Sequence, residues 1–161
     1  MHFGMKLVIA TSNKGKLAEM QPLLAEAGFN AVPQSEFGFA DAEESGFTFV
    51  ENALLKARNA CRQTGLPALA DDSGLIIDAL NGAPGLISAH YAGVHGDAAG
   101  NIAKVLREMA AHEAPLKSAR FYCCIVLLQH AEDPQPIIAE GIWHGEILDA
   151  PLGEHGFGYD P

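Results

Sequence analysis

Leu69-Ala70-Asp71-Asp72-Ser73-Gly74-Leu75 places two adjacent carboxylates between two short apolar runs. The run that ends at Ala70 predicts a strand, and Ser73-Gly74 predicts a turn before Leu75-Ile76-Ile77 leads away. Carboxylates at a strand end, on a turn that glycine permits, are placed to hold a metal ion or to activate a water molecule. The alternative is an Asp-rich turn whose side chains cap their own backbone. This stretch alone leaves both interpretations open.

The composition is that of a globular protein. Its 161 residues suit one domain, or one domain with a small lobe, and a hydrophobic fraction of 48% excludes wholesale disorder. No apolar run reaches transmembrane length and the N-terminus lacks a signal-peptide pattern, so we expect a cytoplasmic protein. Residues 1–4 precede a second methionine and are expected to be a leader or an alternative start. The predicted single domain therefore spans residues 5–161.

Charge and cysteine content narrow the kinds of partner. The formal net charge of -10 argues against a nucleic-acid partner, and no membrane partner is expected. A small polyanionic substrate remains compatible, provided that nearby lysines and a divalent cation offset the negative field. Cys61, Cys123 and Cys124 lack the spacing of metal ligands and are predicted to be buried free thiols.

A strand–loop–helix pattern near the N-terminus is typical of phosphate binding. Lys6–Ala10 predicts a buried strand, which leads through Thr11-Ser12-Asn13-Lys14-Gly15-Lys16 into a helix with one apolar side. The helix N-terminus attracts an anion at such a junction, and the two lysines add positive charge. An ordinary connection capped by Ser12 or Asn13 is the alternative, but the two lysines favour phosphate. Pro22 is expected to kink or shorten the helix.

The clearest helix is predicted over Phe47–Gly65. Thr48 and Glu51 form a capping box at its start, and Asn52 and Lys56 lie off its apolar stripe. The other predicted elements are a short strand over 30–34, a loop over 35–46 that carries Asp41, Glu43 and Glu44, a helix over 97–112, an antiparallel hairpin over 119–148 and a glycine-rich end over 153–161.

Five motifs follow one another in the order of a known family: Ala10-Thr11-Ser12-Asn13-Lys14-Gly15-Lys16, Phe47-Thr48-Phe49-Val50-Glu51-Asn52-Ala53, Ala70-Asp71-Asp72-Ser73-Gly74-Leu75, Asn81-Gly82-Ala83-Pro84-Gly85 and Gly156-Phe157-Gly158-Tyr159-Asp160-Pro161. Together they resemble the inosine triphosphate pyrophosphatase family of the bacterial type. The resemblance implies Mg²⁺-dependent hydrolysis of deaminated purine nucleoside triphosphates (ITP, dITP, XTP) to monophosphate and pyrophosphate. It implies an α/β fold with a long, twisted, mixed β-sheet, helices in two lobes and a substrate cleft between them. It also implies a homodimer.

The resemblance further implies a role for individual residues. Asp72 would accept the proton of the attacking water. Mg²⁺ would be held by carboxylates of the acidic loop and of the central stretch, namely Glu43, Glu44, Asp71 and Asp72. The substrate would be contacted by Thr11, Ser12, Asn13, Lys14, Gly15 and Lys16 at the triphosphate, by Asn52 and Lys56 at the phosphates, by Ser73, and by Phe157, Gly158, Tyr159 and Asp160 along the base and sugar.

Two departures from the family pattern bear on activity. His90 stands where the family usually has arginine, which removes a permanent charge. The chain stops at Pro161, whereas the family continues into a segment that reads the purine, so a C-terminally truncated member with weak base selectivity is expected. One alternative is therefore a non-catalytic or weakly active nucleotide-binding or dimerisation module. The other is a related nucleotide pyrophosphatase that acts on a different base.

Overall fold

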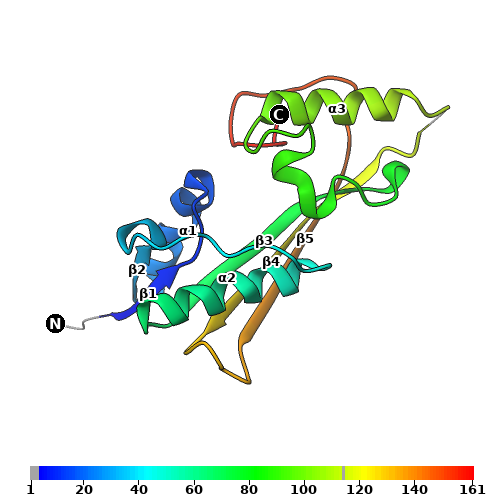
Figure 1. Ribbon diagram of the computed structural model, residues 1–161. Helices are drawn as coiled ribbons and strands as arrows, with labels where there is room; N and C mark the ends of the chain where they lie inside the picture. The colour runs from blue at the N-terminus through cyan, green and yellow to red at the C-terminus, as the bar shows by residue number, and fades with distance from the viewer. Residues whose placement is uncertain (1–3, 114) are drawn as a thin grey trace. The chain divides into compact units, whose positions relative to one another are not determined.

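The computed structural model describes residues 4–113 and 115–161, so residues 1–3 of the predicted leader lie outside the described residues. The described chain forms a mixed α/β fold with one sheet in the order β2-β1-β3-β4-β5 (Figure 1). Its strands and α-helices are β1 (Met5–Ile9), α1 (Lys14–Glu26), β2 (Phe29–Pro33), α2 (Phe49–Thr64), β3 (Ala68–Ile77), α3 (Ala98–Ala110), β4 (Ser118–Leu128) and β5 (Ile137–Glu146). The predicted α/β class with a long mixed sheet is confirmed.

The chain divides into two compact units. Unit 1 contains the chain up to Asp72 together with Cys124–Glu140, and unit 2 contains Ser73–Cys123 and Gly141–Pro161. The long strands β3, β4 and β5 each contribute residues to both units. The predicted arrangement of lobes around a substrate cleft stays a prediction.

Unit 1 is built on parallel pairing of β1 with both β2 and β3. The register sets Ile9 beside Pro33 on one side and Leu69 on the other. Leu7, Ile9 and Leu69 form a buried cluster. Apolar residues of α1, β2 and β4 pack against it: Leu17, Met20, Leu24, Phe29, Ala31, Ile125 and Leu127. Because β1 and β3 run the same way, the residues that follow Ile9 lie alongside the part of β3 that follows Leu69.

The turn predicted at Ser73-Gly74 is wrong, because β3 runs without interruption from Ala68 to Ile77. Gly74 keeps the extended backbone of the strand, so its freedom to adopt a positive φ is not used. Asp71 and Asp72 are buried and form ion pairs with lysines, so their side chains are not free to build a local turn. Tertiary partners here override the local turn preference of Asp, Ser and Gly.

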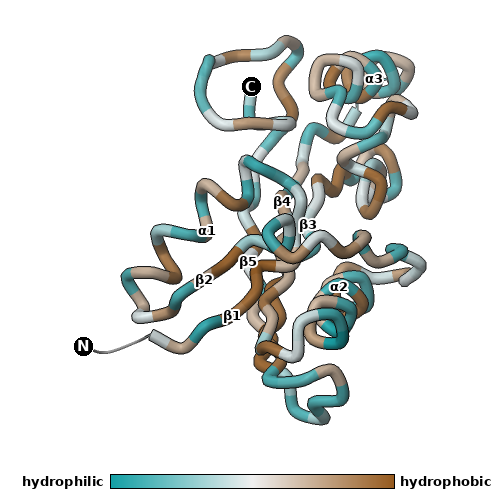
Figure 2. Tube along the Cα trace, turned by 60° about the vertical axis from the view of Figure 1, so that its left-hand side comes forward, coloured by the Kyte–Doolittle hydropathy of each residue, from teal (hydrophilic) through white to brown (hydrophobic). Residues whose placement is uncertain are grey.

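The predicted helix after the acidic loop is confirmed as α2. The Thr48 hydroxyl accepts a hydrogen bond from the Glu51 N–H (3.3 Å), and the Glu51 carboxylate accepts one from the Phe47 N–H (3.1 Å). The first contact is that of the predicted capping box, whereas in the second Glu51 reaches the N–H of the residue before the N-cap Thr48. Gly65 ends the helix in the left-handed conformation, with φ 67°. Brown and teal segments alternate along α2 in Figure 2, the pattern of a helix with one apolar side.

The α1 helix begins at Lys14, inside the phosphate loop that was predicted over Thr11–Lys16. Asn13 is its N-cap, one of the two residues, with Ser12, that the alternative interpretation of this junction named as a cap. Pro22 lies inside the helix, which continues to Glu26, so the proline does not end it. The three cysteines are free thiols as predicted; Cys61 and Cys124 are buried and Cys123 is half-buried.

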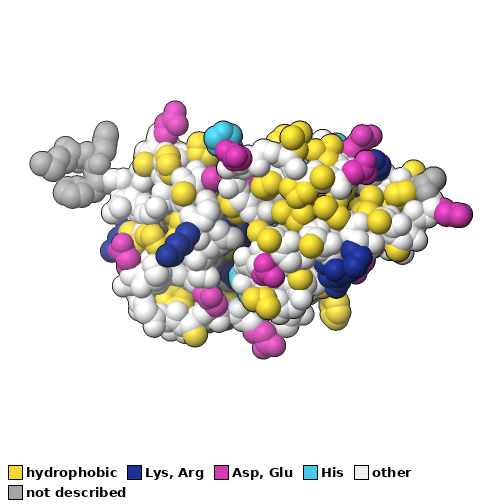
Figure 3. Space-filling model, turned by 90° about the horizontal axis from the view of Figure 1, so that it is seen from above, with side chains coloured by type: hydrophobic (Ala, Val, Ile, Leu, Met, Phe, Trp, Pro, Cys, Tyr) yellow, Lys and Arg dark blue, Asp and Glu magenta, His cyan; other side chains and the backbone are white. Residues whose placement is uncertain are grey.

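Unit 2 has its own apolar core. It joins Leu75 and Ile77 of β3 to Val105 and Met109 of α3, with Ala119 of β4 beside them. The hairpin predicted over 119–148 is present as β4 and β5, which are neighbours in the sheet and run in opposite directions (Figure 1). In Figure 3, hydrophobic side chains gather in the right-hand half of the view, on the side where α3 lies in Figure 1. Among the described residues, no helix is long and apolar enough to cross a membrane.

Candidate functional site

The loop that joins β1 to α1 is held by its own side chains. The buried Thr11 hydroxyl accepts a hydrogen bond from the Asn13 N–H (3.1 Å), and the Asn13 side chain accepts one from the Lys16 N–H (3.1 Å). This geometry fixes the first turn of α1, where helix N–H groups and the dipole favour an anion. The loop is therefore shaped before any ligand is bound.

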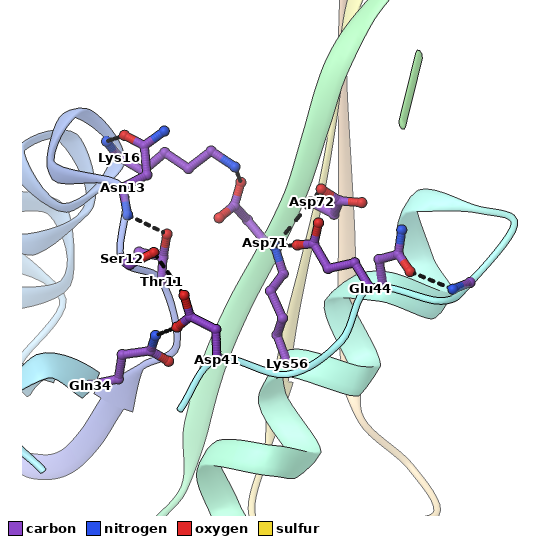
Figure 4. Close-up of polar contacts among 12 residues, drawn as sticks. Thr11, Ser12, Asn13, Lys16, Gln34, Asp41, Glu44, Lys56, Asp71 and Asp72 are labelled. Carbon is purple, nitrogen blue, oxygen red and sulfur yellow. Dashed lines mark hydrogen bonds and ion pairs between the residues drawn. The ribbon is translucent and has the colours of Figure 1, made fainter. Parts of the chain in front are cut away.

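Three ion pairs bring Lys16 and Lys56 to the central carboxylates and to Glu44 of the acidic loop. The Lys16 ammonium lies 2.8 Å from the carboxylate of Asp71, whose side chain is 2% exposed. The Lys56 ammonium lies 2.8 Å from the Glu44 carboxylate and 3.8 Å from that of Asp72. Figure 4 shows Lys16 reaching β3 from the α1 side and Lys56 reaching it from α2. Carboxylates and amines from four separate stretches of sequence thus meet within unit 1.

The alternation of side chains along β3 explains why the two aspartates have different partners. Leu69 packs with residues of α1, and Asp71, two positions later, points to the same face and meets Lys16. Asp72 points to the opposite face and meets Lys56 of α2. An uninterrupted strand therefore presents one carboxylate to each side of the sheet, as the labelled side chains in Figure 4 show.

Burial makes Asp72 an unusual carboxyl group. Desolvation by burial raises the pKa of Asp72 from 3.8 to about 6, and the charge of Glu44 adds to that rise. The charges of Lys56 and Lys16, and a hydrogen bond from Asn52, oppose it. Burial alone would lower the pKa of Lys56, but its bond to Glu44 and the aspartate charges raise it instead. A carboxylate with a pKa near 6 is a stronger base than an ordinary aspartate and is still ionised at neutral pH.

Asn52 links α2 to the acidic loop. Its side chain is 2% exposed, and its amide oxygen accepts a hydrogen bond from the Gly46 N–H (2.7 Å). A Cβ atom at residue 46 would lie 2.7 Å from that oxygen and 2.6 Å from the Cβ of Glu51, so this close approach requires glycine. Asn52 therefore lies beside Asp72 and fixes the segment that carries Glu44.

The four predicted metal ligands are not preassembled around one point. Glu44 and Asp72 both approach Lys56, Asp71 approaches Lys16, and Glu43 is exposed. Within residues 4–113 and 115–161, no group of three or more His, Cys, Asp or Glu side chains is arranged to hold a metal ion. The four side chains supply hard carboxylate oxygens, but those of Asp71, Glu44 and Asp72 are paired with lysines in this structure.

The remaining predicted substrate residues belong to unit 2. The Tyr159 hydroxyl donates to the Ser88 carbonyl (2.7 Å), and its ring packs against the unit 2 core. The Phe157 N–H donates to the Asp160 carboxylate (2.9 Å), while the Phe157 side chain is 39% exposed. Tyr159 and Asp160 also line a cavity of about 250 Å³ whose walls are mostly apolar. Ser73, which lies within β3, is the first residue of unit 2.

Two polar residues of the site were not singled out from sequence. Asp41 accepts hydrogen bonds from the Ser12 hydroxyl (3.1 Å) and from the side chain of Gln34. Gln34 is 7% exposed and begins a short 3₁₀ helix, Gln34–Glu36, directly after β2. Asp41 lies in the same acidic loop as Glu44, and this was the only feature of the sequence that pointed to it as a site residue. Gln34 carries no such signal, because its partner is fixed by tertiary structure.

Replacing Asp72 with asparagine is expected to stabilise the metal-free protein at about pH 8, by about 1–2 kcal/mol after allowing for residual solvation. The folded state holds the Asp72 pKa at about 6, above the ordinary 3.8, so folding favours the protonated carboxyl. The contribution of the protonated Asp72 to the free energy of unfolding is therefore fully present below about pH 4, and it is lost as the pH rises to about 6.

Urea unfolding of the parent and of Asp72→Asn in EDTA, at about pH 4 and about pH 8, measures the difference. The gain should be present at the higher pH and vanish at the lower one. A gain of equal size at both values would mean that ionisation of Asp72 is not its cause.

Comparison with known proteins shows the family to which this chain belongs. The chain belongs to the Ham1 family, which matches residues 7–161. A dITP/XTP pyrophosphatase of Xylella fastidiosa is 58% identical over 156 residues, covering 97% of this chain and 78% of the relative. A dITP/XTP pyrophosphatase of Vibrio cholerae is 54% identical with the same coverage of both chains. The family resemblance drawn from the five motifs is thereby confirmed.

Solved structures lead to the same family. A HAM1 protein from Coxiella burnetii superposes with a TM-score of 0.90 at 52% identity, covering 98% of this chain and 80% of that one. The Ham1 protein of Staphylococcus aureus gives a TM-score of 0.82 at 38% identity, covering 97% and 79%. At these identities the likeness extends beyond the fold to the sequence that builds it.

Proposed function

We propose that this chain hydrolyses deaminated purine nucleoside triphosphates, namely dITP, XTP and ITP, to the monophosphate and pyrophosphate. The observation that carries the proposal is the set of three ion pairs that join Lys16 to Asp71 and Lys56 to Asp72 and Glu44. Relatives named dITP/XTP pyrophosphatase, 54–59% identical over nearly the whole chain, support this substrate class. The alternatives of a non-catalytic module and of a different base have no comparable support.

The triphosphate is expected to lie at the N-terminus of α1. Thr11 and Asn13 shape the loop through their side chains, and this shape supports binding through the N–H groups of the first helical turn. Lys14 is exposed, and Gly15 and Lys16 follow it in that turn. The charge of Lys14 is open to the phosphates, whereas Lys16 would exchange its contact with Asp71 for one with a phosphate. Lys56 and Asn52 are expected to act from α2.

A divalent cation fits the donor set. Glu43, Glu44, Asp71 and Asp72 supply hard carboxylate oxygens, which suit Mg²⁺ better than softer metals. The lack of a preassembled cluster among the described residues agrees with an ion that takes much of its coordination from phosphate oxygens and water. When bound, such an ion would supply charge stabilisation at the phosphates.

Asp72 is proposed to accept the proton of the attacking water. Its pKa of about 6 leaves it ionised at neutral pH, yet makes it more basic than an exposed aspartate. The Lys56 ammonium at 3.8 Å stabilises the ionised form and limits side-chain movement. Phe157, Gly158, Tyr159 and Asp160, with Ser73, are expected to contact the base and sugar from unit 2. A homodimer remains an expectation from the family, and a cytoplasmic location remains an expectation from the sequence.

The test is product analysis with the purified chain and MgCl₂. Pyrophosphate and monophosphate should form in equal amounts from dITP and from XTP. Asp72→Asn, prepared in parallel, controls for contaminating pyrophosphatases. Release of orthophosphate in place of pyrophosphate, or binding of dITP without turnover, would contradict the proposal; the second result would favour a nucleotide-binding module.

A further inference from the structure

Asp41 connects the phosphate loop to two other parts of unit 1. One carboxylate oxygen accepts from the Ser12 hydroxyl at 3.1 Å, and the other accepts from the Gln34 side chain (Figure 4). The preceding residue is also fixed, because the Ala40 carbonyl accepts from the Asn59 side chain of α2 at 3.0 Å. Asp41 therefore holds the loop after β1 through Ser12, and its own position is fixed by contacts with Gln34 and, through Ala40, with α2.

The direction of the Ser12 hydrogen bond limits what that side chain can do. A serine hydroxyl has one proton to donate, and here it points to the Asp41 carboxylate. While that bond lasts, the Ser12 side chain has no proton to offer a phosphate oxygen. The N–H of Asn13, the next residue, donates to the Thr11 hydroxyl and so helps to shape the same loop.

The same segment carries a group that belongs to the second ion pair. Residues 39–48 form no helix or strand; Asp41 contacts the phosphate loop and Glu44 contacts Lys56 at 2.8 Å. Gly46 is fixed in turn by Asn52. Segment 39–48 thus ties the Lys16 region to the Lys56 region through contacts that need no ligand.

We infer that Asp41 is a positioning residue for triphosphate binding, which holds the Ser12 hydroxyl away from the phosphates and fixes the loop through it. The inference rests on the proposed function and adds a role for a residue that contacts neither lysine. By charge alone, the carboxylate of Asp41 would weaken the binding of a polyanion such as a triphosphate. Its benefit must therefore come from the hydrogen bonds that it accepts, and a neutral residue of the same shape should serve as well.

Calorimetry with inorganic tripolyphosphate and MgCl₂ tests this without any dependence on base recognition or turnover. Asp41→Ala should weaken binding about tenfold, the order expected for a lost hydrogen bond to a charged group. Asp41→Asn should bind within about threefold of the parent, because its amide can satisfy both partners once the Gln34 amide turns over. Glu36→Ala, which removes an exposed carboxylate nearby, is the matched control and should match the parent.

A double-mutant cycle with Ser12→Ala separates the two roles that Ser12 can have. If Ser12 acts through Asp41, the double variant Ser12→Ala/Asp41→Ala loses no more affinity than either single variant. Additive losses would place the Ser12 hydroxyl on the phosphate and overturn the inference. Asp41→Ala that binds as well as the parent would also overturn it, and would leave the proposed function intact. A parent chain that binds no tripolyphosphate would overturn both.

Discussion

The Asp72→Asn variant is expected to hydrolyse dITP about 10²–10⁴-fold more slowly than the parent, the usual contribution of a positioned general base. Asparagine keeps the size of the side chain and removes only its ability to take a proton and its charge. Burial raises the pKa of Asp72 to about 6, and the variant loses the base that this setting creates. Rates measured at saturating dITP and MgCl₂ give the change in kcat.

The control for this variant is Glu19→Gln, which makes the same chemical change on the exposed surface of α1. It should retain the parent rate. An Asp72→Asn variant that keeps more than about a tenth of the parent kcat would contradict the role of Asp72 as base, because general-base effects smaller than tenfold are unusual. The expected rise in stability at about pH 8 provides evidence that the variant is folded when the rate is measured.

Lys16→Ala is expected to weaken binding of dITP about 10–100-fold, since a charge-assisted contact to phosphate is lost. Binding of deoxyinosine, which has no phosphate, should change little. Lys6→Ala removes the same charge from β1 and controls for the net charge of the protein. Calorimetry with both ligands measures the ratio. Equal losses for dITP and deoxyinosine would show that the loop after β1 is not a phosphate site.

Much of unit 1 was predictable because its signals are local or follow from strand direction. The apolar run of β1, the Asn13 cap and the capping box of α2 each depend on residues a few positions apart. The meeting of Thr11–Lys16 with Asp71 follows from parallel pairing, since Ile9 lies beside Leu69 and the chain that leaves β1 passes the part of β3 that carries Asp71.

The errors and omissions have a common physical cause. Asp-Asp-Ser-Gly has strong turn chemistry, and nothing in the local sequence reveals that lysines from α1 and α2 will hold the aspartates within a strand. The Asp41 contacts are similar, because Ser12 lies 29 residues away and Gln34 is an amide with many possible partners. Side-chain partners fixed by tertiary structure are outside the reach of pattern and propensity.

The ion pairs of the site make the two ligands of the proposed reaction thermodynamically interdependent. A triphosphate that engaged Lys16 and Lys56 by itself would leave buried Asp71 and Asp72 without their cations, and a lone divalent cation would have to displace the same lysines. Uncompensated buried charge is costly, so each ligand restores the balance that the other disturbs. Linkage then requires that each raise the affinity of the other by one common factor. Metal-free nucleotide and free cation should both be poor ligands, and their complex the species that the protein selects.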